Sequence, residues 1–188
     1  KAKSYATATV MFTDFVEFSA FARVLTAEEL VEQIDFYFRA FDTVIQRYGL
    51  EKIKTIGDSY MCAGGLPVAN KTNAVDTVAA AVEIRDFIED QKNKRREAGL
   101  PYFEIRIGCN TGPVVAGIVG IKKFAYDIWG DAVNLAARME QSGQPGRVNI
   151  SDATRQLLPE NEFVFEARGR VAAKNKGEVE MFFVEKKG

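Results

Sequence analysis

The stretch IKTIGDSYMCA, residues 53–63, predicts two short strands around which the other elements of the chain can be arranged. Two short, mostly apolar runs, residues 53–56 and 59–63, are separated by Gly57 and Asp58 alone. A glycine-containing dipeptide between two such runs is typical of a tight β-hairpin. We therefore expect an antiparallel pair of strands here, with Asp58 at the tip of the hairpin.

A strand and a long helix are predicted before this hairpin. The β-branched and apolar run Thr7–Thr13 (TATVMFT) predicts a buried strand that stops at Asp14. Thr26 followed three residues later by Glu29 forms a capping box, which marks the start of a helix. Apolar residues then recur at helical spacing until Gly49. They are Leu30, Ile34, Phe38, Phe41 and Ile45.

The order of elements after the hairpin completes a recognisable plan. A second long helix is predicted from Asn73 to about Ala98, with two strands, residues 103–109 and 114–119, joined through residues 110–113 (NTGP). The order βαββαβ plus a strand is the split βαβ, ferredoxin-like plan, in which helices pack on one face of an antiparallel sheet. We expect an α+β fold with a C-terminal αβ extension, and one domain over residues 1–188.

Composition excludes several function classes. The chain has no histidine, which argues against hydrolase triads and zinc chemistry, and its net charge of −1 supplies no general field for nucleic acid. Cys62 and Cys109 lie in apolar runs typical of buried thiols in a reducing cytosol. No apolar stretch approaches the length of a membrane span, so a soluble domain is expected, and the thiols favour the cytoplasm. The start at Lys1 suggests a domain cut from a longer protein with a regulatory part elsewhere.

Two aspartates are predicted to meet at one edge of the sheet. In the split βαβ plan the first and third strands are antiparallel neighbours, so Asp14 at the end of one lies beside Asp58 at the start of the other. Like charges at this distance favour cations between them, and magnesium or manganese ions suit carboxylate ligands. The alternative is that Asp14 caps the next helix and Asp58 serves the turn.

The run GDAVNLAARME, residues 130–140, predicts a further helix with a polar face. Asp131 is positioned to cap it, and Asn134 and Arg138, four residues apart, project from one side. This pair suggests a functional face, although an ordinary exposed polar pair has the same spacing. Phe15 to Phe18, after Asp14, are predicted to open a short helix whose backbone amides receive a triphosphate.

Three motifs together resemble the class III nucleotidyl cyclases, and specifically an adenylyl cyclase catalytic domain. They are Phe12–Asp14 (FTD), Lys52–Asp58 (KIKTIGD) and Tyr126–Met139 (YDIWGDAVNLAARM). The likeness covers nearly the whole chain in order, and it implies conversion of ATP to cyclic AMP and pyrophosphate. It also implies a head-to-tail homodimer with two composite sites and two Mg²⁺ or Mn²⁺ ions per site.

The resemblance implies a role for each matching residue. Asp14 and Asp58 correspond to the metal-binding aspartates, and Arg106 to a phosphate-binding arginine of the same half-site. Lys54 and Asp127 match the purine-selecting pair. The remaining assignments are Asn134 for orienting the ribose, Arg138 for stabilising pentavalent phosphorus, and Lys174 for the triphosphate, with Lys176 as the alternative. The family often has glycine where this chain has Glu17.

The purine preference also follows from hydrogen-bond chemistry. Adenine offers an acceptor at N1 and a donor at its exocyclic amine, which complement an ammonium and a carboxylate, whereas guanine presents the reverse order. Guanylyl cyclases usually carry Glu and Cys where this chain has Lys54 and Asp127. A diguanylate cyclase would carry a different hairpin motif. A catalytically silent nucleotide-binding module and a guanylyl cyclase remain the alternatives to an adenylyl cyclase.

Overall fold

The computed structural model describes residues 1–173, 175 and 177–188, and of residues 19–21 it describes the backbone alone. None of the described helices combines the length and apolar character needed to cross a membrane. In chain order the elements are β1 (Lys3–Val16), α1 (Phe18–Val24), α2 (Ala27–Arg47), β2 (Glu51–Ile56), β3 (Ser59–Gly64), α3 (Asn73–Glu97), β4 (Glu104–Val119), β5 (Ala125–Trp129), α4 (Asp131–Gln141), β6 (Val148–Ser151), α5 (Asp152–Arg155), β7 (Phe163–Ala173) and β8 (Gly177–Lys186).

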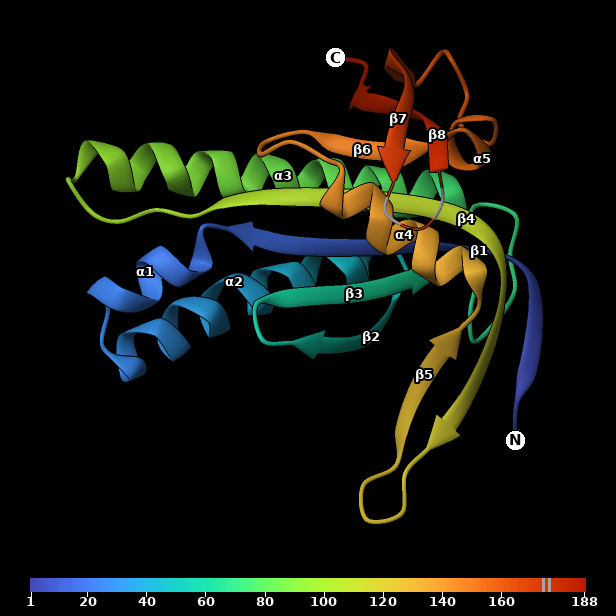
Figure 1. Ribbon diagram of the computed structural model, residues 1–188, viewed down its shortest axis with the longest axis horizontal. Coiled ribbons are helices and arrows are strands. Elements are labelled where there is room, and N and C mark those ends of the chain that lie inside the picture. The colour runs from blue at the N-terminus through green and yellow to red at the C-terminus, as the bar shows by residue number, and fades with distance from the viewer. Residues whose placement is uncertain (174, 176) are drawn as a thin grey trace.

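The described strands form one sheet in the order β2-β3-β1-β4-β6-β8-β7, with β5 paired to β4 outside this path. β1 lies between β3 and β4 and is antiparallel to both. The predicted βαββαβ core is confirmed as β1-α2-β2-β3-α3-β4, and the elements after β5 extend the sheet through a parallel pairing of β4 with β6 (Figure 1).

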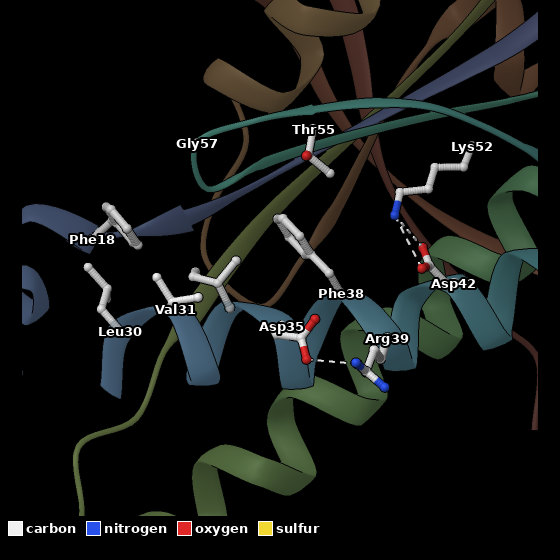
Figure 2. A pocket seen from close by; sticks show the side chains of 11 residues that line it. Phe18, Leu30, Val31, Asp35, Phe38, Arg39, Asp42, Lys52, Thr55 and Gly57 are labelled. Atoms are coloured by element: carbon white, nitrogen blue, oxygen red, sulfur yellow. Dashed lines mark hydrogen bonds and ion pairs between the residues drawn. The ribbon is translucent and has the colours of Figure 1, made fainter. Parts of the chain in front are cut away.

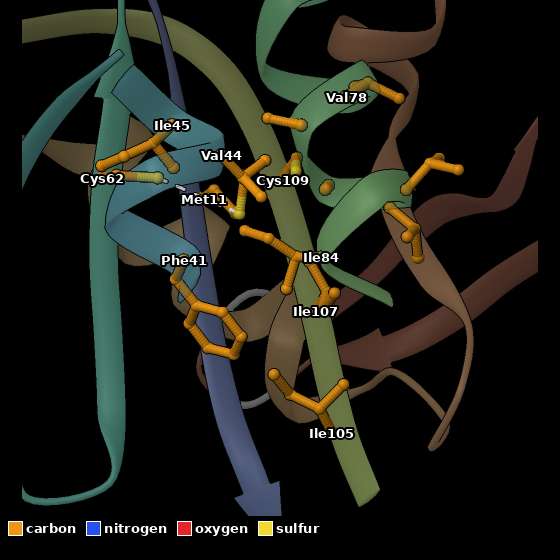
Figure 3. Close-up of a cluster of buried hydrophobic side chains, with 14 of the residues drawn as sticks. Met11, Phe41, Val44, Ile45, Cys62, Val78, Ile84, Ile105, Ile107 and Cys109 are labelled. Carbon is orange, nitrogen blue, oxygen red and sulfur yellow. Dashed lines mark hydrogen bonds between the residues drawn. The ribbon is translucent and has the colours of Figure 1, made fainter. Parts of the chain in front are cut away.

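The two long helices cover one face of the sheet. The capping box predicted at the start of α2 is present: the Glu29 N–H donates to Thr26 Oγ1 and the Thr26 N–H donates to Glu29 Oε1, both at 3.1 Å. The buried side chains of α2 and α3 meet those of β1, β3 and β4, and these include the fully buried thiols of Cys62 and Cys109 (Figure 3). Burial of this apolar layer is the main stabilising term for the core.

The shorter helix α4 packs on the opposite face. Val10 contacts the cluster that contains Ala132 and Ala136 of α4, whereas its neighbour Met11 contacts the cluster beneath α2 and α3. Successive residues of a strand point to opposite faces of a sheet. The face of β1 that carries Val10 therefore lies beneath α4.

Residues 104–119 form one strand where the sequence suggested two, residues 103–109 and 114–119. β4 runs continuously from Glu104 to Val119 through Asn110–Pro113. Its register with β1 shifts between Tyr5 and Ala8, opposite this segment, and Pro113 is exposed there. A proline is tolerated at such an irregularity because it has no N–H to donate to the ladder. The later part of β4 bends away with β5 as a projecting hairpin (Figure 1).

β1 also extends beyond its predicted end. Asp14 lies inside the strand, opposite Ser59 of β3 and Arg106 of β4, and the ladder continues to Val16. The prediction that Phe15 to Phe18 open a helix is therefore wrong for Phe15 and Val16, and α1 begins at Phe18. Pairing with Ile105 and Glu104 of β4 holds Phe15 and Val16 extended, and a single sequence does not reveal those partners.

Candidate active site

Asp14 and Asp58 come together at one end of the β1/β3 pair. Asp14 is opposite Ser59, whose Oγ donates a hydrogen bond of 3.2 Å to Asp14 Oδ1, and Asp58 occupies the turn between β2 and β3. Burial, together with a hydrogen bond to Asp14 and its charge, raises the pKa of Asp58 to about 6. The two carboxyl groups thus share one small, partly buried space, as the predicted topology requires.

This pair suits hard divalent cations. Carboxylate oxygens are preferred ligands of Mg²⁺ and Mn²⁺, and Mg²⁺ is commonly held by one or two carboxylates plus substrate phosphates. Among the described residues, no group of three or more His, Cys, Asp or Glu side chains forms a closed metal cage. Asp14 and Asp58 therefore form an open site with two carboxylates. A cation bound there would have coordination positions left for phosphate oxygens.

Phe15 contributes to this site through its backbone. Its side chain is 3% exposed and packs against the rings of Tyr37, Phe38, Phe41 and Phe103. A hydrogen bond from the Phe15 backbone amide lowers the pKa of Asp58 and so opposes the larger effect of burial. The amide at Phe15 is thus engaged with a carboxylate. Glu17, where the family often has glycine, has a φ of 59° and an exposed side chain, and glycine adopts this left-handed conformation most readily.

Arg106 lies on the same face as Asp14. The two residues are paired across β4 and β1, with Arg106 Nη2 at 3.9 Å from Asp14 Oδ2. The Nε of the same guanidinium lies 3.1 Å from Glu140 Oε2. Burial and the nearby charge of Asp14 raise the pKa of Glu140 to about 7, although the hydrogen bond from Arg106 acts in the opposite direction.

Glu140 was not identified from the sequence. It lies near the end of α4, where a carboxylate faces the negative end of the helix dipole. A buried acidic residue in the last turn is therefore unfavourable unless it has a partner. An acidic residue at this place near the end of a predicted helix is the sequence feature that could have identified Glu140.

Lys54 and Asp127 form the second cluster. Lys54 on β2 and Asp127 on β5 are joined by an ion pair of 2.8 Å between Nζ and Oδ2. The Lys54 side chain is 43% exposed and that of Asp127 15%. Asp127 Oδ1 also accepts a hydrogen bond of 2.8 Å from the Ile128 N–H, which fixes the carboxylate. The structure thus brings together the two residues predicted to select the purine.

Asn134 and Arg138 are displayed by α4. Asn134 is exposed, and Arg138 is half-buried with its guanidinium donating to Gln141. The described residues show no ion pair between Arg138 and either Asp14 or Asp58, so no such contact joins the two predicted parts of the site within one chain. Lys174 and Lys176, the candidates for the triphosphate contact, lie outside the described residues.

Hydrogen bonds at both ends fix α4 to the sheet. The side-chain amide of Asn110 donates to the Ala132 carbonyl at 3.0 Å, and that of Asn149 donates to the Met139 carbonyl at 2.8 Å. The helix N-cap is Gly130, so the predicted capping role of Asp131 is wrong, and Asp131 lies instead in the first turn. A carboxylate there is favoured by the helix dipole without being the cap.

A family model and individual relatives match this chain over nearly its whole length. The family model described as the adenylate and guanylate cyclase catalytic domain matches residues 1–186. An adenylate cyclase of Mycobacterium bovis is 37% identical over 183 residues, which is 97% of this chain and 40% of that protein. Human guanylyl cyclase C is 38% identical over 176 residues, which is 92% of this chain and 16% of that protein. The chain therefore spans less than half the length of these relatives.

A solved structure agrees over the full length. The catalytic core of a rhodopsin-guanylyl cyclase with converted specificity, in complex with ATPαS, superposes with a TM-score of 0.91 at 32% identity. The match covers 100% of this chain and 99% of that one. With the fold and the family match in agreement, this chain belongs to the adenylate and guanylate cyclase catalytic domain family.

Proposed function

We propose that this cyclase domain is an adenylate cyclase, which converts ATP to 3′,5′-cyclic AMP and pyrophosphate. The observation that carries the choice of ATP is the ion pair of Lys54 with Asp127. The relatives carry both adenylate and guanylyl cyclase names, so the family alone leaves the purine open.

The specificity argument rests on donors and acceptors. An ammonium donates to the acceptor N1 of adenine, and a carboxylate accepts from its exocyclic amine. Guanine places a donor at N1 and an acceptor at O6, so the same pair would leave polar groups unmatched, which is costly in a partly buried site. Asp127, at 15% exposure and fixed by the Ile128 N–H, is the better ordered of the two groups.

In the proposed reaction the 3′-hydroxyl oxygen of ATP bonds to its own α-phosphorus, and the bond from that phosphorus to the bridging oxygen breaks as pyrophosphate leaves. The hydroxyl proton passes to solvent, substrate or Asp14. Two Mg²⁺ or Mn²⁺ ions, when bound, supply charge neutralisation and a more acidic hydroxyl. Asp14 and Asp58 would hold them, Arg106 would bind phosphate, Asn134 would orient the ribose, and Arg138 would neutralise charge that develops in the transition state.

The separation of these groups on one chain supports a head-to-tail homodimer with two composite sites. The β4–β5 hairpin offers an apolar surface for such contact, with Ile121 94% and Phe124 75% exposed. Exposed large apolar side chains grouped on one projecting element favour a protein partner. A second copy of this chain would bring Asn134 and Arg138 of one protomer to the metal pair of the other.

We further propose that residues 1–188 form one catalytic domain of a longer, regulated protein. The 40% and 16% of the relatives' lengths that the chain matches leave room for such domains. Its free, buried thiols and its use of ATP favour the cytoplasm.

Product formation from ATP and from GTP tests this function directly. We expect the purified domain, at high protein concentration with Mn²⁺, to form cyclic AMP from ATP alone, and Asp14→Ala to abolish it. Formation of cyclic GTP instead would favour the guanylyl cyclase assignment. No product from a domain shown to dimerise and to bind nucleotide would favour a silent module.

A further inference from the structure

Glu140 is a buried acidic residue for which the proposed reaction assigns no role. Its side chain is 8% exposed, and it contacts the Nε of Arg106 at 3.1 Å. Burying a carboxylate is costly, and an apolar residue of similar volume often serves stability as well or better than a buried ion pair. The location at the end of α4 adds an unfavourable helix-dipole contribution. Stability alone is a poor explanation for this residue.

The backbone around Glu140 is held in place by close packing. A Cβ atom at Gly108 would lie 2.0 Å from the Glu140 backbone nitrogen, so α4 rests directly on β4 at this glycine. Asn149 donates to the carbonyl of the preceding Met139. Gly108 and Arg106 are two residues apart on β4 and thus share a face. Close packing between α4 and β4 therefore places Glu140 next to Arg106.

Two nitrogens of the Arg106 guanidinium have different carboxylate partners. Nε faces Glu140 at 3.1 Å, while Nη2 lies 3.9 Å from Asp14 Oδ2. An arginine binds phosphate best through a planar fork of parallel N–H groups, so the rotation of the guanidinium matters. A carboxylate on Nε limits that rotation and leaves Nη2 on the side of Asp14.

We propose that Glu140 is a positioning residue that holds Nε of Arg106 and thereby presents the Nη groups of Arg106 to phosphates bound beside Asp14 and Asp58. This inference rests on the proposed function for the identity of the ligand class, a nucleoside triphosphate or pyrophosphate. Glu140 itself does not touch substrate. Its charge would repel phosphate if Arg106 did not lie between them.

Pyrophosphate binding to the whole domain, measured by calorimetry with Mn²⁺, tests the proposal without turnover. Glu140→Met removes the acceptor and the charge at similar volume, and we expect it to weaken pyrophosphate binding about tenfold. Glu140→Gln retains an acceptor oxygen, and we expect a loss of about threefold. Glu83→Gln, which removes a carboxylate from the Arg47 pair on the α2/α3 side, is the matched control and should bind as wild type.

A double-mutant cycle separates positioning from a general structural role. If Glu140 acts through Arg106, Glu140→Met or Glu140→Gln added to Arg106→Ala should not weaken pyrophosphate binding further, because without the guanidinium the Glu140 carboxylate only repels phosphate. An unchanged or tighter affinity in the Glu140 single variants, or the same tenfold loss in the Arg106→Ala background, would overturn the proposal. If Glu140→Met does not melt cooperatively, the Gln variant carries the cycle.

Activity assays keep this proposal distinct from the proposed function. We expect the Glu140 variants to raise the KM for ATP while the ratio of ATP to GTP use stays as in wild type, because the purine pair is untouched. A wild-type domain that forms no cyclic AMP contradicts the proposed function, whereas the pyrophosphate cycle still decides the role of Glu140.

Discussion

Lys54 and Asp127, separated by 73 positions in the sequence, form an ion pair of 2.8 Å between β2 and β5. Each group orients the other, and the Ile128 N–H adds a third contact to the carboxylate. An ammonium and a carboxylate fixed side by side make a site with a defined hydrogen-bond order. Purine choice should therefore depend on this pair as a unit.

Exchange of the pair should change the substrate. We expect Lys54→Glu combined with Asp127→Cys to lower the ratio of kcat/KM for ATP to that for GTP by at least about hundredfold, because unmatched polar groups are costly in a binding site. Rates of cyclic AMP and cyclic GTP formation measure the ratio. Lys52→Glu, on the same strand, is the control and should leave the ratio unchanged. A double variant that still prefers ATP would contradict the role of the pair.

The α4 pair should act mainly in the transition state. We expect Asn134→Ala and Arg138→Ala each to lower kcat by at least about hundredfold with less than a threefold change in KM for ATP. Steady-state kinetics at saturating Mn²⁺ provide both constants. Gln141→Ala removes the neighbour to which Arg138 donates and serves as the control for local packing. A proportionate loss in ATP affinity would refute the assignment.

Mixing inactive protomers should restore activity if the sites are composite. Asp14→Ala would lack a proposed metal ligand, and Arg138→Ala would lack the group proposed to act in the partner's site. Random reassortment in a head-to-tail dimer makes about half the dimers mixed, each with one intact site, so about a quarter of wild-type activity is expected. The measurement is cyclic AMP formation by the mixture against each protein alone. No recovery despite exchange of subunits would contradict shared sites.

The projecting hairpin should control dimerisation. Burial of a side chain as large as that of Ile121 or Phe124 contributes roughly 1.5–3 kcal/mol, so Ile121→Ser or Phe124→Ser should weaken the dimer about tenfold or more. Analytical ultracentrifugation measures this change, and activity should recover at high protein concentration. Val31→Ser, which alters another exposed apolar residue on α2, is the control. Equal weakening by all three variants would argue against the hairpin.

Stability without metal should fall as the pH rises. Burial raises the pKa of Glu140 from 4.5 to about 7 and that of Asp58 from 3.8 to about 6. The folded protein therefore binds protons that the unfolded chain has released, so this contribution is complete below the unfolded values and is lost as pH passes through the folded ones.

Thermal melts in metal-free buffer between pH 5 and pH 8 check this expectation. The melting temperature of wild type should decline across the interval, and that of Glu140→Gln should decline less. Mn²⁺ should restore more stability at pH 8 than at pH 5, because metal binding requires ionised carboxylates. Parallel curves for the two proteins would contradict a raised pKa of Glu140 in the folded protein.

Local patterns in the sequence determined the core plan. The capping box at Thr26, the spacing of apolar residues in α2 and the Gly57-Asp58 turn each depend on residues close in the chain, and the structure has all three. The chain order of these elements then predicts that β1 lies beside β3, and so that Asp14 lies near Asp58.

Tertiary structure decided what depends on distant partners. The sequence predicts Asn110 and Thr111 as turn residues, yet they lie inside β4. Their side chains are satisfied there by distant residues: Ser151 donates to Asn110, and the hydroxyl of Thr111 bonds to those of Thr9 and Thr154. The role proposed for Glu140 likewise depends on its contact with Arg106, which is 34 positions away in the sequence. A polar residue can be buried in a sheet or a helix when its hydrogen bonds are satisfied there, and the satisfying groups come from elements that local sequence does not specify.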